Sequence, residues 1–177
     1  VIDIFLTETA ELADVVLPAT AFAETDGTAT NTERRVQRLR AAVSPPGKAK
    51  PDWWIIAQMA QRLGLSNFDY QHPKAIFNEL CRLSPVYTGL NWERIEDGQY
   101  QWPVPEVGHP GTPVLHQDEF VNGRGVFKIT SYRDPHETIS NEYPIWLTTG
   151  RRLTSYHTRT QTGRSAGIDY LLAEEAL

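Results

Sequence analysis

The sequence has 177 residues with a formal net charge of -5, and 40% of them are apolar, 22% charged and 10% aromatic. This composition excludes an intrinsically disordered chain, and no apolar run approaches the roughly 20 residues that cross a bilayer. The acidic balance argues against nucleic acid or an anionic membrane as a partner, and the single cysteine excludes a disulfide framework and favours a reducing, cytoplasmic location.

The first 25 residues have the pattern of half an α/β layer. The β-branched residues of 1–6 predict a strand, 8–14 leaves room for about two helical turns, and 15–18 predicts a second apolar strand. The sequence begins without Met and stops on apolar residues, so we expect it to be a fragment of a longer protein.

A turn, a strand and two helices are predicted next. Asp26-Gly27 is typical of a two-residue turn, and 34–43 follows it as a half-exposed strand. One helix begins at Pro51 and ends at Gly64, and another spans the residues from Pro73 to just before Pro85. The first is predicted to be largely buried, through Trp53, Ile56, Ala57, Ala60 and Leu63, and the second to bury Ile76, Phe77, Leu80 and Cys81.

The stretch 85–113 is rich in Pro, Gly and Trp and has no sustained period. We predict an ordered, irregular segment that buries Trp92 and Trp102 against neighbouring domains, because exposed rings would not offset the entropy of ordering it. Beyond it, 125–130 and 143–149 predict strands, and we expect a domain boundary in the polar linker between them, at 133–142.

The strongest candidate site follows the last predicted strand. From Tyr143 to Ile168 there is no Asp or Glu, while four arginines, one histidine and many hydroxyls follow the strand. Gly150 permits close backbone approach to an oxyanion, arginine has a planar fork that matches phosphate, and Ser and Thr add short donors. The pattern indicates a phosphorylated ligand, and a solvated basic loop is an equally good interpretation.

A second candidate is the basic segment around 27–37. Asn31 and nearby hydroxyls could bind the edge of a heterocycle, and Glu33 could pair with Arg34 or accept from an amino group. Composition alone favours a solvated hairpin here. The scattered histidines predict no metal site, and Cys81 is interpreted as packing rather than as a nucleophile.

Several motifs, in order along the chain, resemble the molybdopterin-dependent oxidoreductases of the dimethyl sulfoxide reductase superfamily. They are the residues at 3–10, 13–18, 27–28, 31–37, 51–53 and 148–151. Within that superfamily the sequence is most similar to the alpha, catalytic subunit of formate dehydrogenase, with matches at 101–103, 109–113 and 157–158.

The resemblance implies a full-length enzyme with molybdenum or tungsten on two molybdopterin guanine dinucleotides and a 4Fe-4S cluster held by residues outside this chain. Formate would be oxidised to carbon dioxide in a two-electron reaction, and electron-transfer subunits would be partners. The metal ligand and catalytic residues would lie upstream, so this fragment should hold no catalytic or metal-binding residue and be inactive alone. The alternatives are a nitrate reductase-like member and a non-catalytic electron-transfer subunit resembling the large subunit of complex I.

The implied fold is mixed α/β. Residues 1–25 would end an α/β cofactor domain, 26–140 would form a cluster-side middle region with two helices, and 141–177 would start a C-terminal β-barrel that binds the dinucleotide. Arg159 stands where the common family pattern has Gly, which argues against a close backbone approach there. The implied cofactor-binding residues are Gly150, Arg151, Arg152, Ser155, His157, Thr158 and Thr160, together with Asn31, Glu33 and Arg34.

Overall fold

The computed structural model describes residues 1–171, and the chain divides into two compact units, one from Val1 to Asp118 and one beginning at Glu119. In the described part, no helix combines the length and the apolar character that a membrane span needs. The structure contains both helices and small sheets, which confirms the mixed α/β prediction. The domain boundary expected at 133–142 concerns the whole protein and stays a prediction.

The N-terminal end of the first unit has the predicted strand, helix, strand order. Strand β1 (Ile2–Asp3) pairs in parallel with β2 (Leu17–Pro18), and helix α1 (Glu8–Glu11) lies between them in the chain. Thr7 begins α1, because its hydroxyl accepts from the backbone N–H of Ala10 at 3.2 Å. Two parallel strands must be joined by a crossover connection, and the helical segment between β1 and β2 provides one.

A hairpin forms the central sheet of the first unit. A short 3-10 turn, η1 (Phe22–Glu24), precedes β3 (Gly27–Thr30), which pairs antiparallel with β4 (Arg35–Leu39), and β5 (Tyr100–Gln101) joins the other edge of β4. The strand predicted at 34–43 is therefore confirmed, in shorter form.

The turn predicted at Asp26-Gly27 is wrong. Gly27 is the first paired residue of β3, and the hairpin turns at 31–34 instead. There the side chain of Asn31 accepts from the backbone N–H of Arg35 at 2.9 Å, and Arg34 adopts a left-handed conformation with φ 67°. An asparagine side chain can close a turn by itself, so the Asp-Gly pair is not needed for it.

Both predicted helices are present. Helix α2 spans Asp52–Arg62 and α3 spans Pro73–Leu83, where the His72 ring accepts from the N–H of Lys74 and begins the helix. The two buried faces differ from the prediction. Helix α2 buries Ala57 and Ala60 as expected, together with Ile55, but Ile56 and Leu63 are exposed and Trp53 is half-buried. Helix α3 buries Phe77 and Cys81, while Leu80 is exposed and Ile76 is half-buried. The described residues cover only part of the apolar surface of α2, so the prediction that this helix is largely buried is wrong in this structure.

The stretch 85–113 is ordered, as predicted, but it is not wholly irregular. It contains β5 and the six-residue helix α4 (Trp92–Asp97), which begins at Asn91 through a 2.8 Å bond from the N–H of Arg94. Elements this short leave no period to detect in a sequence. Trp92 is 7% exposed and packs in the core of this same unit, which corrects the expectation of burial against a neighbouring domain.

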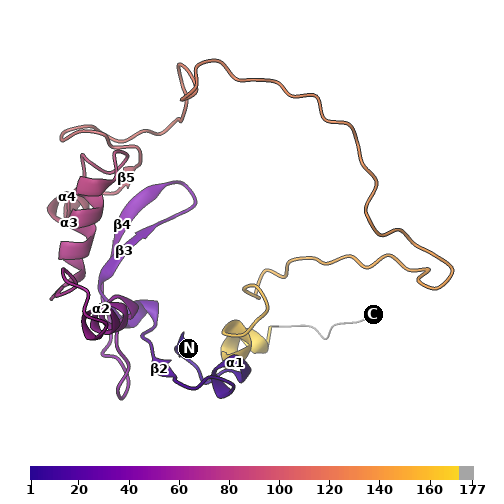
Figure 1. The fold of residues 1–177 in the computed structure, drawn as a ribbon, viewed down its shortest axis with the longest axis horizontal. Helices are drawn as coiled ribbons and strands as arrows, with labels where there is room; N and C mark the ends of the chain where they lie inside the picture. The colour runs from indigo at the N-terminus through magenta and orange to yellow at the C-terminus, as the bar shows by residue number, and fades with distance from the viewer. Residues whose placement is uncertain (172–177) are drawn as a thin grey trace. The chain divides into compact units, whose positions relative to one another are not determined.

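The core of the first unit lies between the hairpin and the helices α3 and α4, which run along it in Figure 1. The half-buried Trp102 packs against it. The buried members are Val36, Phe77, Cys81, Leu90, Trp92, Ile95 and Val104.

Arg38 covers one side of this core. Its guanidinium lies 3.4 Å from the centre of the Trp92 ring, its side chain is 6% exposed, and its Nε donates to Glu96 at 2.6 Å. The hydrogen bond from Arg38 lowers the pKa of the Glu96 carboxyl below its ordinary value. This contact therefore links β4 to α4.

The Arg38–Glu96 contact predicts a loss of local stability in acid. Because the pKa of the Glu96 carboxyl is lower in the folded state, the contact contributes its full stabilisation above the ordinary carboxyl pKa of about 4.3. This stabilisation is lost as the pH falls through the lower, folded-state pKa. We expect hydrogen exchange of the 92–97 peptide, corrected for intrinsic rates, to accelerate in that range. Glu96→Gln should abolish this acid-dependent component, and an unchanged pH profile in the variant would contradict the assignment.

Cys81 is buried in the core, and burial raises the pKa of its thiol to about 11. At neutral pH almost none of it is thiolate, and the thiolate is the nucleophile. We expect iodoacetamide to leave Cys81 unmodified at pH 7.5 in the folded protein and to label it in denaturant, as measured by peptide mass spectrometry. Complete labelling under native conditions would show that this core opens.

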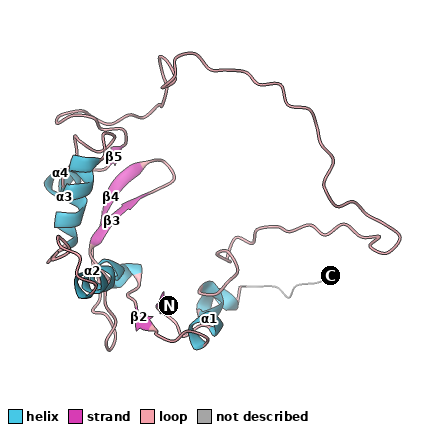
Figure 2. Ribbon diagram, in the orientation of Figure 1, coloured by secondary structure: helices cyan, strands magenta, loops and turns pink. Residues whose placement is uncertain are grey.

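The second unit is mostly loop until residue 162, as Figure 2 shows. Neither 125–130 nor 143–149 is a strand, so these two predictions are wrong for the structure. A strand needs a partner for its backbone groups, and the apolar side chains here remain exposed, such as Phe127 and Leu147. The β-barrel predicted to begin at 141 stays a prediction.

Candidate functional site

The basic loop after residue 149 folds back on itself. The N–H of Arg159 donates to the carbonyl of Tyr156 at 3.0 Å, and the N–H of Gly163 donates to the carbonyl of Arg159 at 2.9 Å. A 3-10 turn, η2 (Thr162–Arg164), and helix α5 (Ala166–Asp169) follow. These local bonds shape a concave surface from a single run of sequence.

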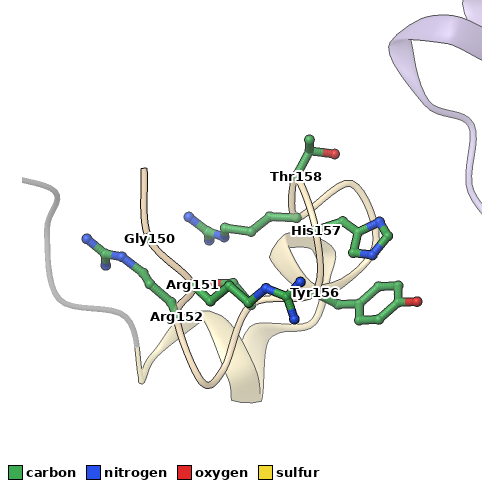
Figure 3. Close-up of a pocket in the computed structure, with 8 residues that line it drawn as sticks. Gly150, Arg151, Arg152, Tyr156, His157 and Thr158 are labelled. Atoms are coloured by element: carbon green, nitrogen blue, oxygen red, sulfur yellow. The ribbon is translucent and has the colours of Figure 1, made fainter. Parts of the chain in front are cut away.

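The loop encloses a cavity of about 370 Å³, shown in Figure 3. This volume is near the lower end of the range for small-molecule sites, about 300–1,000 Å³. Six of the residues predicted to bind a cofactor line it together, while the predicted Thr160 does not. The lining residues are Gly150, Arg151, Arg152, Ser155, Tyr156, His157, Thr158 and Arg159.

The cavity is cationic. Three of the described lining residues are arginines, and none of the described lining residues is an Asp or Glu. Figure 3 shows the side chains of Arg151 and Arg152 leaving the loop in opposite directions. Arg151 is exposed and makes no hydrogen bond or ion pair with any residue in 1–171. A guanidinium in such a place is available to a phosphate or carboxylate of a ligand.

Aromatic and hydroxyl groups complete the lining. The rings of Tyr156 and His157 are stacked, with centroids 4.3 Å apart and planes 9° from parallel. The hydroxyl oxygen of Ser155 is buried, and no hydrogen-bond partner for it is found among the described residues. A buried hydroxyl without a partner is unfavourable unless a ligand or water satisfies it.

The other predicted cofactor residues lie in the first unit and have structural contacts there. Asn31 closes the hairpin turn, and Glu33 pairs with Arg35 at 3.0 Å rather than with Arg34. Arg34 donates to the carbonyl oxygens of Trp102 and of Pro113, the latter at 2.9 Å. Their part in cofactor binding stays a prediction.

Two cavity residues were not among the predicted site residues. Tyr156 stacks on His157, and Arg159 occupies a left-handed backbone conformation with φ 65°. The acid-free composition of the loop could have pointed to Arg159, but no local pattern in the sequence reveals its backbone conformation.

Within the described residues, no group of His, Cys, Asp and Glu is arranged to hold a metal ion.

The donor set fits a phosphate-bearing group with a heterocyclic ring. Guanidinium groups and hydroxyls match phosphate oxygens, and the buried Ser155 hydroxyl is a donor without a partner in the described chain. The stacked rings offer a flat surface of the kind that packs against a planar ring. The cavity can therefore bind and orient such a group.

Comparison with known proteins adds independent information. The sequence model of the family "Molybdopterin oxidoreductase" matches residues 1–62. The chain is 50% identical over 169 residues to the F420-dependent formate dehydrogenase subunit alpha of Methanocaldococcus jannaschii, which covers 94% of this chain and 25% of that protein. It is 43% identical over 169 residues to a putative formate dehydrogenase of Bacillus subtilis, covering 94% of this chain and 17% of that protein. Among solved structures, acetylene hydratase from Pelobacter acetylenicus matches with a TM-score of 0.43 and 27% identity, over 55% of this chain and 14% of its own.

The chain therefore spans about a quarter of the length of the archaeal relatives that it matches. The matches to those relatives cover more than nine-tenths of the chain itself, so they include the cavity loop as well as the first unit.

Proposed function

We propose that this chain belongs to the molybdopterin oxidoreductase family, whose sequence model matches residues 1–62, and that it forms part of a formate dehydrogenase alpha subunit, in which it contributes a wall of the cofactor site. Family membership agrees with the resemblance noted from the sequence and implies a molybdopterin cofactor. The observation that carries the proposal is the cavity, which brings together six of the predicted cofactor residues; three of its eight described lining residues are arginines and none is a carboxylate.

We propose that the cofactor is a pair of molybdopterin guanine dinucleotides carrying molybdenum or tungsten, with a 4Fe-4S cluster held by other parts of the protein. The bound metal would supply the two-electron oxidation of formate to carbon dioxide. This chain's residues would bind and orient the organic part of the cofactor. Electron-transfer subunits and a cytoplasmic location belong to the same proposal.

Each group in the cavity has a proposed task. Arg151 and Arg152 bind phosphate or pterin oxygens, while the hydroxyls of Ser155 and Thr158 donate shorter hydrogen bonds. The His157 ring, stacked on Tyr156, provides a flat contact for a heterocycle. Gly150 allows the ligand to approach the backbone, because no described residue other than its two chain neighbours has an atom within 4 Å of where its Cβ would be. Thr160, Asn31, Glu33 and Arg34 do not line this cavity, and their part in cofactor binding remains a proposal.

The proposed function is tested with the full-length protein. We expect molybdenum or tungsten and guanine nucleotide to co-purify with it, and formate rather than nitrate to support electron transfer with an artificial dye. Nitrate-dependent dye oxidation without formate activity would favour the nitrate reductase-like alternative, and absence of both metal and nucleotide would contradict the proposal. The 177-residue chain alone should give no formate-dependent dye reduction above a buffer control.

A further inference from the structure

A groove lies on the first unit, between helix α2 and strand β2. The backbone N–H of Lys50 donates to the carbonyl of Pro18 at 3.0 Å, which holds the segment before α2 beside β2. The space that this arrangement leaves has a volume of about 290 Å³. We call it the α2 groove, and its lining residues are Leu17, Pro18, Lys48, Lys50, Trp54, Ile55, Gln58, Met59 and Arg62.

Large apolar side chains of the α2 groove remain exposed to solvent. Trp54 is 37% exposed and Met59 is 48% exposed, although Ile55 between them is buried. Exposed apolar side chains that gather at one place on a surface are typical of an interaction site. The groove therefore has the character of a surface that another segment covers.

The charged residues of the α2 groove are all cations. They are Lys48, Lys50 and Arg62, and none of the described lining residues is an Asp or Glu. The Nζ of Lys50 lies 5.7 Å from the centre of the Trp54 ring, and Arg62 donates to the side-chain oxygen of Gln58 at 2.8 Å. None of the three cations forms an ion pair within residues 1–171. Charge complementarity then favours an occupant that carries Asp or Glu.

We propose that the α2 groove binds an acidic amphipathic segment of the same full-length polypeptide, from outside these 177 residues. An apolar side chain of that segment packs on Trp54 and Met59, and its carboxylates pair with Lys48 and Lys50. The inference rests on the proposed function only in taking this chain as part of a longer alpha subunit.

Two observations favour the same polypeptide over a separate subunit. The chain spans about a quarter of the length of its archaeal relatives, so most of such a protein lies outside it. The match to the family model, residues 1–62, includes every residue of the α2 groove, so the groove belongs to the family's shared part. A covalently linked segment also has an effective concentration on the order of 1 mM, which a separate subunit lacks.

The first measurement is cross-linking of the full-length protein with a carbodiimide, which joins a lysine amine directly to a carboxylate in contact with it. We expect peptide mass spectrometry to find Lys48 or Lys50 joined to an Asp or Glu of the same polypeptide, outside residues 1–177. A cross-link to another subunit, or to a carboxylate within residues 1–177, would overturn the proposal. Where no cross-link forms, the second measurement decides.

The second measurement is oxidation of Met59 by hydrogen peroxide, which is read without ambiguity because it is the only methionine of these 177 residues. Oxidation should be slower in the native full-length protein than in denaturant. Lys48→Glu should speed it by about tenfold or more, because like charges facing each other across an interface are strongly unfavourable. Lys48 is exposed and makes no hydrogen bond or ion pair within residues 1–171, so this variant breaks no such contact there.

Lys128→Glu is the matched control, because Lys128 is an exposed lysine that does not line the α2 groove, and it should leave the oxidation rate unchanged. Cys81 should stay unlabelled in both variants, which shows that the core is intact; where Lys48→Glu exposes Cys81, the milder Lys48→Gln takes its place.

Oxidation of Met59 as fast in the native protein as in denaturant would show an open groove and overturn the proposal. Protection that gel filtration removes would indicate a small ligand, and protection that the Lys48 variant leaves unchanged would indicate an occupant held without carboxylates. Either result also overturns it. All of these results leave the proposed function standing, since that fails only on the metal, nucleotide and formate measurements.

Discussion

Gly89→Ala is expected to disrupt the packing of the first unit. An ideal Cβ at this position would lie 2.0 Å from the carbonyl oxygen of Glu106 and 2.8 Å from that of Val104. Both are backbone atoms, so no side-chain rotation can relieve the overlap. The two segments would have to separate, at a point where Val104 is completely buried.

The separation would also break hydrogen bonds. The N–H of Gly89 donates to Val104 at 2.7 Å, and the carbonyl of Gly89 accepts from Arg94 at 2.5 Å. Overpacking a core typically costs about 1–3 kcal/mol, and the backbone shift required here places this variant at about 3 kcal/mol or more. That corresponds to about a hundredfold faster hydrogen exchange where opening of this core limits exchange.

The measurement is hydrogen exchange of peptides covering 86–106 in the full-length protein. Gly27→Ala is the matched control, because Gly27 has no atom within 4 Å of its Cβ position and no positive φ. It should leave exchange of these peptides nearly unchanged. Equal protection in Gly89→Ala and the wild type would show that the two segments are not in contact as described.

The sequence predicts the helices of this protein better than its strands. Helices α2 and α3 are specified locally, by Pro51 and Pro73 at their starts and by the apolar spacing that follows, so their positions are correct. Their buried faces are less predictable, because exposure of Ile56 depends on which neighbours cover α2. Apolar periodicity indicates which face of a helix can be buried, whereas actual burial depends on which other elements pack against that face.

The strands are predicted less well than the helices. The residues at 125–130 and 143–149 have strand composition, but a strand is completed by hydrogen bonds to a partner, and the structure gives these segments none. Strand β4 is correct, in shorter form, because its pattern lies within one short run of sequence, whereas β3 was not predicted as a strand. The turn was misplaced because Asn31, through its side chain, closes a longer connection than Asp26-Gly27 would.

The candidate site was predictable in composition and not in geometry. An acid-free loop with arginines and hydroxyls indicates an anionic ligand, and six of its predicted residues do line one cavity. The stacking of Tyr156 on His157 and the left-handed conformation of Arg159 arise from turns within the loop. Residue types alone do not encode those turns, since neither position carries the glycine or asparagine that usually marks them.

Arg151→Ala is expected to weaken the affinity of the full-length enzyme for its cofactor by about one to two orders of magnitude, and so to lower cofactor occupancy. This loss corresponds to about 1.5–3 kcal/mol, the contribution of one charge-assisted contact. Arg151 lines the cationic cavity, is exposed, and has no hydrogen-bond or ion-pair partner within residues 1–171. Its removal therefore breaks no hydrogen bond or ion pair within residues 1–171, so a loss of cofactor would reflect a contact with the cofactor itself. Arg151→Lys should retain part of the affinity, because the charge remains and the planar fork is lost.

The readouts for Arg151 are molybdenum or tungsten and guanine nucleotide per subunit, together with formate-dependent dye reduction per bound metal. Arg133→Ala is the matched control, because Arg133 is an exposed arginine of the same unit that does not line the cavity. It should retain wild-type occupancy. We expect activity per bound metal to stay close to the wild-type value in Arg151→Ala, because the residue binds the organic part of the cofactor and touches no reacting atom. Full occupancy and wild-type activity in Arg151→Ala would instead identify the loop as a solvated basic surface, the interpretation that its composition alone supports equally well.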